Sequence, residues 1–213
     1  MSNKTLLYYG HDPMCSFCWA FRPTWTKIKS KLAECSPEIE IVYVMGGLAP
    51  DSDDPMPEEL RSKLSVTWRY IEQNIPGTQF NFDFWSQQQP PRSTYPACRA
   101  VIAAKMLKPE LEDAMILAIQ HAYYLNAQNP SNQDTLIQCA ESIGLEKQLF
   151  AKTLHSAECD KAFTEERMLS RGLGIYGFPS LVISRGNSRF NVPVDYNSAT
   201  SVLDRLYETA ALL

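Results

Sequence analysis

Two cysteines three residues apart, Cys15 and Cys18, stand where an apolar segment gives way to a long helical pattern. Residues 4–9 are apolar and partly aromatic, which predicts a short buried strand. Across residues 15–34, large apolar side chains recur on one helical face. Charged and apolar residues alternate at the start of the segment 38–45, and the segment ends in apolar residues. This pattern predicts a second strand. This order predicts two parallel strands joined by a right-handed crossover, with the cysteines where the first strand leads into the helix.

The rest of the chain is helical in its middle and returns to strands near its end. Residues 57–173 carry apolar side chains at helical spacing. Two short runs, 180–184 and 188–192, flank an Arg-Gly-Asn turn and predict a hairpin. Residues 197–212 predict a closing helix. The overall order is strand–helix–strand, a helical block, then strand–strand–helix, which predicts an α/β fold in which both ends share one mixed sheet.

The length of 213 residues fits one large domain or a smaller one with an insertion. We expect residues 1–50 and 174–213 to form the sheet domain and residues 51–173 to form a helical lid. A net charge of −4 argues against a nucleic-acid or anionic-membrane partner. No run approaches the roughly 18 apolar residues of a membrane-spanning helix, and the N-terminus lacks a signal-peptide pattern, so we expect a cytoplasmic protein.

The Cys15–Cys18 spacing suits disulfide exchange, which needs a thiolate, a second thiol within reach and access for a substrate. Side chains three residues apart lie near each other on a helical turn. A helix N-terminus presents unpaired N–H groups and a positive dipole end, and both favour a thiolate at Cys15. Cys18 lies one turn deeper and is expected to be more buried, where it would attack a mixed disulfide and release the substrate.

Metal binding and structural disulfides are the competing explanations for the six cysteines. A zinc site commonly needs a second close pair of ligands, and the remaining cysteines and the three histidines are isolated, so no metal is expected. Structural disulfides are disfavoured in a long chain that is expected in the cytoplasm. The other cysteines are expected to be small buried hydrophobes, with Cys98 the first to check for exposure; they are Cys35, Cys98, Cys139 and Cys159.

Four further residues are candidates for the site. His11, four residues before Cys15, is the nearest candidate cation that would tune the pKa of that thiol, although a solvent-facing loop histidine is the simpler interpretation. Met14 is expected at the mouth of the site as an apolar substrate contact. Phe178 and Pro179 directly precede the strand at 180–184, where a proline is tolerated if its missing N–H is not needed.

These motifs resemble the DsbA-like thioredoxin superfamily. DPMCSFCW at residues 12–19 and YGFPSLVI at residues 176–183 are separated by a helical insertion, as in that superfamily, and the resemblance covers essentially the whole chain. It is strongest to the cytoplasmic branch of FrnE-like proteins that are predicted disulfide isomerases. The resemblance implies a thioredoxin-like mixed sheet with a large helical insertion domain.

The resemblance also implies roles for particular residues. Cys15 would be the nucleophile and Cys18 the resolving thiol. Pro179 would be cis and face the disulfide, and Phe178 would offer backbone groups to an extended substrate. The dipeptide Ser16-Phe17 replaces the Pro-His of periplasmic DsbA, so the strongly oxidising character of that enzyme is not implied.

The expected function is thiol–disulfide oxidoreductase chemistry of the reductase or isomerase type. Protein or small-molecule disulfides and a thiol reductant are the expected partners, with no cofactor other than glutathione as a candidate reductant or substrate. One alternative is a glutathione-dependent enzyme of the 2-hydroxychromene-2-carboxylate isomerase or kappa transferase class, against which Cys18 argues. The other is a non-catalytic peptide-binding or chaperone-like module. In that case the aromatic residues between 68 and 85 would line its binding groove, although aromatic residues at such spacings more often belong to the core.

Overall fold

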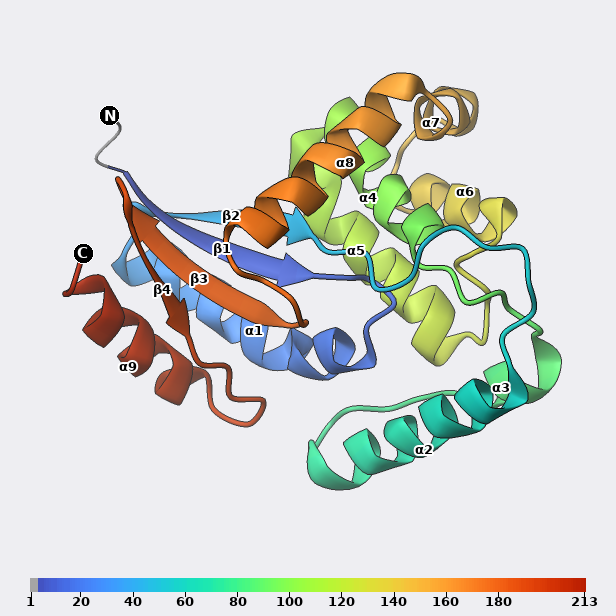
Figure 1. Cartoon of the computed structure of the whole chain (residues 1–213), viewed down its shortest axis with the longest axis horizontal. Helices are drawn as coiled ribbons and strands as arrows, with labels where there is room; N and C mark the ends of the chain where they lie inside the picture. Colours follow the sequence, from blue (N-terminus) through green and yellow to red (C-terminus); the bar gives the residue numbers. More distant parts are fainter. Residues whose placement is uncertain (1–3) are drawn as a thin grey trace.

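The computed structural model describes residues 4–213, and its central element is a four-stranded mixed sheet with the order β2-β1-β3-β4 (Figure 1). β1 pairs parallel with β2 and antiparallel with β3, which in turn pairs antiparallel with β4. The mixed sheet predicted from the two ends of the chain is therefore confirmed. The strands are β1 (Thr5–His11), β2 (Ile39–Met45), β3 (Ser180–Arg185) and β4 (Ser188–Val192).

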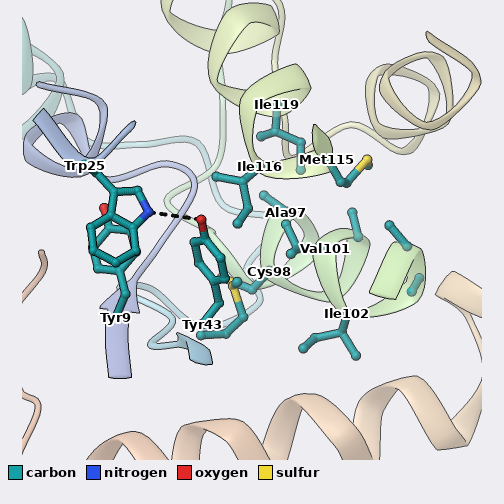
Figure 2. Close-up of a cluster of buried hydrophobic side chains, with 14 of the residues drawn as sticks. Tyr9, Trp25, Tyr43, Ala97, Cys98, Val101, Ile102, Met115, Ile116 and Ile119 are labelled. Carbon is teal, nitrogen blue, oxygen red and sulfur yellow. Dashed lines mark hydrogen bonds between the residues drawn. The ribbon is translucent and has the colours of Figure 1, made fainter. Parts of the chain in front are cut away.

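Two helices, α1 (Ser16–Cys35) and α9 (Ala199–Ala210), lie side by side on one face of this sheet (Figure 1). Alternate side chains of β1 and β2 pack against α1, because successive residues of a strand point to opposite faces. The indole N–H of Trp25 donates to the hydroxyl of Tyr43 over 3.0 Å (Figure 2). This hydrogen bond joins the crossover helix to β2 inside the core.

The opposite face of the sheet is covered by α8 (Ala157–Gly172) and the segment that follows it. Val44 of β2 and Val182 of β3 pack there against Leu173 and Ile175. Ile175 lies so close to Gly10 that a side chain at Gly10 would overlap it. Both faces of the sheet are therefore covered, which explains the apolar second half of β2.

The helical block lies beyond the carboxyl ends of β1 and β2 (Figure 1). Its middle helix, α4 (Tyr95–Leu107), is buried along the Ala-rich stretch and packs against α5 (Glu112–Gln120), α7 (Lys147–Leu154) and α8. The block contains α2 (Glu58–Asn74), α3 (Asp83–Gln87), α4 (Tyr95–Leu107), a 3₁₀ turn η1 (Pro109–Leu111), α5 (Glu112–Gln120), a π-helical turn η2 (His121–Leu125), α6 (Gln133–Ser142) and α7 (Lys147–Leu154).

One hydrophobic cluster runs through both parts of the sequence. It joins Leu7 of β1 and Trp25 of α1 to Val101 of α4 and Leu136 of α6. A second cluster packs Trp68 of α2 with aromatic neighbours from α3, η2 and the connecting loops. The aromatic residues between 68 and 85 are thus mainly core. The division into a sheet domain and a separate helical lid remains a prediction, since side chains from both share one core.

Candidate active site

Cys15 is the N-cap residue of α1 and therefore stands at the mouth of the helix. Its backbone is extended (φ −83°, ψ 114°), and its carbonyl accepts the first helical hydrogen bond from the N–H of Trp19 at 3.0 Å. Its side chain makes no capping hydrogen bond. The N–H groups of the first helical turn consequently remain available to a negative charge on the Cys15 sulfur.

The Cys15 thiol meets the loop that enters β3. It donates to the carbonyl oxygen of Phe178 over 3.4 Å, across a sequence separation of 163 residues. The Phe178–Pro179 peptide bond is cis. The structure therefore brings Cys15, Phe178 and Pro179 together, and Cys15 retains 7% of its surface exposed to solvent.

Cys18 lies behind Cys15 and is fully buried. Burial first, and then the neighbouring Cys15 thiol, raise the pKa of the Cys18 thiol well above its ordinary value. The Cys18 thiol is therefore protonated at neutral pH.

His11 does not occupy the position that the sequence suggested. It is the last residue of β1 rather than a loop residue, and its ring is fully buried, stacked on Tyr9 with ring centroids 5.1 Å apart. Burial, and then the charge of Arg22, lower the pKa of His11 to about 3. The imidazole is neutral at neutral pH, so the expected role as a cation beside Cys15 does not fit this environment.

Asp12 is a site residue that sequence reasoning missed. Its fully buried carboxylate accepts hydrogen bonds from the N–H of Met14 at 2.8 Å, the N–H of Leu48 at 2.7 Å and the hydroxyl of Thr94 at 2.7 Å. The thiol of Cys98 lies 3.6 Å from it. Asp12 thus ties the segment before Cys15 to the loop after β2 and to the start of α4. The only hint in the sequence was an aspartate before a proline.

Met14 is half-buried and packs between the two hydrophobic clusters, next to Cys15. Trp19 is also half-buried, and its indole N–H donates to the carbonyl of Gln79 at 3.0 Å. Cys35 is exposed at the end of α1, which corrects the expectation that all four remaining cysteines are buried; the other three are buried. Within residues 4–213 no group of three or more His, Cys, Asp or Glu side chains is arranged to hold a metal ion.

Gly46 leaves room for the ring of Phe178. A β-carbon at Gly46 would overlap the tip of that ring. We expect Gly46→Ala to turn the ring away and loosen the loop that holds the Phe178 carbonyl against Cys15, lowering kcat/KM for disulfide reduction several-fold. Gly172→Ala is the matched control, because an added β-carbon meets open space there. Equal rates for the two variants would contradict this role of Gly46.

The geometry of this site can be compared with known proteins. A model of a thioredoxin family matches residues 8–200. The chain belongs to this thioredoxin family. A protein of Nitrosomonas europaea, proposed to be a disulfide isomerase, superimposes with a TM-score of 0.85 at 25% identity and covers 98% of each chain. The cytosolic disulfide reductase DsbM of Pseudomonas aeruginosa superimposes with a TM-score of 0.75 at 22% identity, over 97% of this chain and 98% of DsbM. The fold is thus that of a DsbA-like member of the thioredoxin superfamily, and its structural neighbours support a redox enzyme.

The curated relatives that match this chain are named as adapter proteins. The ClpXP adapter protein SpxH of Halalkalibacterium halodurans is 26% identical over 185 residues, and that of Bacillus subtilis is 23% identical over 177. The matches cover 85% and 82% of this chain but only 59% and 56% of the relatives. This thioredoxin-family chain therefore spans less than two thirds of their length.

No helix in the described part of the chain combines the length and the apolarity of a bilayer-crossing segment.

Proposed function

We propose that this protein is a thiol–disulfide oxidoreductase of the reductase or isomerase type, with Cys15 as nucleophile and Cys18 as resolving thiol. One observation carries the proposal. The Cys15 sulfur stands at the N-terminus of α1, 3.4 Å from the Phe178 carbonyl, with the buried Cys18 thiol one helical turn further in. This arrangement supplies the three requirements of exchange: a sulfur that helix N–H groups can hold as a thiolate, a second thiol, and a backbone surface for the substrate.

The reaction has two steps. The Cys15 thiolate attacks one sulfur of the substrate disulfide, forming a mixed disulfide and releasing the other half as a thiolate, which takes up a proton. Cys18 then loses its proton and attacks the Cys15 sulfur, which releases the second half of the substrate and leaves a Cys15–Cys18 disulfide. Two molecules of an external thiol, of which glutathione is the candidate, return the pair to the dithiol and are themselves joined in a disulfide. Two electrons pass from thiol to substrate in each cycle.

The surroundings of each sulfur suit its step. Deprotonation of Cys15 removes its hydrogen bond to Phe178 and frees that carbonyl to accept an N–H from an extended substrate. The raised pKa of Cys18 keeps it from competing as the first nucleophile. Met14 offers an apolar contact beside the attacking sulfur. In a reducing cytosol, the setting proposed here, the pair would rest as thiols and act as a reductase or isomerase.

Thiol counting tests the proposal directly. The reduced Cys35→Ser variant, which lacks the exposed cysteine, is freed of reductant, mixed with excess 2-hydroxyethyl disulfide and quenched with acid, and its free thiols are counted after denaturation. We expect the loss of two of its five thiols, with peptide mapping placing the new disulfide between Cys15 and Cys18. Five remaining thiols, or a disulfide between other cysteines, would overturn the assignment.

The adapter relatives favour a second candidate function, the binding of a protein without redox chemistry. The observation behind it is the similarity to SpxH over 85% of this chain. The two candidates separate in a Cys15→Ala/Cys18→Ala variant, in which an adapter keeps its partner affinity and an oxidoreductase loses all turnover. The fold likeness to 2-hydroxychromene-2-carboxylate isomerase (TM-score 0.58, 15% identity) shows the fold alone, and the presence of a second thiol, Cys18, one turn from Cys15 favours dithiol chemistry over that class.

A further inference from the structure

A polar cavity of about 210 Å³ is lined in part by Phe178, the residue whose backbone meets Cys15. Its walls come from the loop after β2, from the last turns of α8 and from the segment that leads to the cis proline. Phe178 belongs to both places: its carbonyl accepts from Cys15, while its ring packs over Gly46 and lines the cavity. A single residue, Phe178, therefore connects the cavity to the reacting sulfur.

Two arginines of α8, Arg167 and Arg171, line this cavity. Within the part of the chain that the structure describes, neither forms an ion pair with a carboxylate. The neighbouring Glu166 is already engaged, since it binds Lys105 at 3.0 Å and accepts the N–H of Met45 at 2.9 Å. Like charges four residues apart on a helix repel each other, which an anion placed between them would relieve.

Arg167 is held in place by aromatic rings rather than by a counter-ion. Its guanidinium lies 4.4 Å from the ring centroid of Tyr95 and 5.6 Å from that of Phe163. Its Nε atom is buried and has no hydrogen-bond partner. A stacked guanidinium with unused donors beside a cavity is suited to bind a carboxylate in a bidentate manner.

We propose that this cavity is a carboxylate subsite, and that the preferred substrates are disulfides bearing a carboxylate close in the chain to the reacting sulfur. The inference rests on the proposed function and names its substrate class. Glutathione disulfide meets the description, as does a protein disulfide with an acidic residue close by. In either case the Cys15 thiolate takes one sulfur of the disulfide, the other half leaves as a thiolate, and the subsite holds the carboxylate of the half that stays attached.

The test compares kcat/KM for anionic and neutral disulfides. The substrates are glutathione disulfide, 2-hydroxyethyl disulfide, and two peptide disulfides that differ only in Glu or Gln two residues from the cysteine. The variants are Arg167→Met/Arg171→Gln, which keeps an apolar side chain against Tyr95, and Arg171→Lys. Lys161→Gln, an exposed charge on the same helix and outside the cavity, is the matched control.

We expect the double variant to lose at least about tenfold in kcat/KM for glutathione disulfide, with less than about a twofold change for 2-hydroxyethyl disulfide. The Lys161→Gln control should stay near wild type, and Arg171→Lys, which keeps the positive charge, should lose less than the double variant. A matching loss for the Glu peptide but not the Gln peptide would extend the subsite to acidic protein segments; a loss for glutathione disulfide alone would restrict it to the small molecule. No loss, or an equal loss with the neutral disulfide, would overturn the subsite. If the wild-type protein reduces none of the four, the proposed oxidoreductase function fails instead.

Discussion

Replacing Cys15 with serine should lower the rate of disulfide reduction by on the order of a thousandfold or more. A serine hydroxyl stays protonated at neutral pH and is a far weaker nucleophile than a thiolate, so the first step of exchange is lost. Folding should be nearly unaffected, since the hydroxyl can donate to the Phe178 carbonyl as the thiol does. The measurement is the steady-state rate with 2-hydroxyethyl disulfide, alongside a thermal unfolding curve.

Cys35→Ser is the matched control for this change. Cys35 is exposed at the far end of α1 and touches none of the site residues, so its variant should keep the wild-type rate. Residual activity of more than a few per cent in Cys15→Ser, or a comparable loss in Cys35→Ser, would contradict the role assigned to Cys15.

Replacing Asp12 with alanine should destabilise the protein by about 3 kcal/mol, because three donors lose an acceptor that is itself fully buried. Those donors are the N–H groups of Met14 and Leu48 and the hydroxyl of Thr94. The same change frees the segment that carries Cys15, so disulfide reduction should also slow. Urea unfolding measures the first effect and the steady-state rate the second.

Asp53→Ala, in the exposed acidic loop, is the control and should change stability by less than about 0.5 kcal/mol. An Asp12→Asn variant keeps the size and shape of the side chain but removes its titratable carboxyl group. Burial raises the pKa of Asp12, so the folded state holds the carboxyl proton more tightly than the unfolded state does. The contribution of this proton to stability is therefore full below the ordinary pKa of an aspartate and is lost as the pH rises through the raised pKa of Asp12. Asp12→Asn should lack this component. Equal unfolding free energies for Asp12→Ala and wild type would contradict the network.

Local patterns predicted the elements that build the sheet. Polar and apolar residues alternate along residues 39–45, and Phe21, Trp25 and Ile28 are spaced as on one side of a helix. Both patterns reflect burial of a single face, which can be read from one segment of the sequence without knowing its neighbours in the fold. The strand–cysteine–helix junction placed Cys15 within one residue of its observed position at the N-cap. Its partner loop at Phe178 came from the resemblance, because no local pattern reports a contact across 163 residues.

Burial and charge at the site could not be predicted in this way. The partners of Asp12 lie 36 and 82 residues away, so its carboxylate looked like part of an ordinary turn. His11 was expected to face solvent, yet β1 continues through it and places its ring on the buried face. Cys35 follows the core position Leu32 at helical spacing, but α1 ends there and nothing covers it.

The central claim, that Cys15 attacks and Cys18 resolves, is tested most directly by trapping the mixed disulfide. A Cys18→Ser/Cys35→Ser variant lacks the resolving thiol and the exposed cysteine that would react non-specifically. After incubation with a labelled peptide disulfide, we expect a stable one-to-one adduct that mass spectrometry maps to Cys15, and only a transient one when Cys18 is present. An adduct on another cysteine, none at all, or equal lifetimes with and without Cys18 would contradict the account.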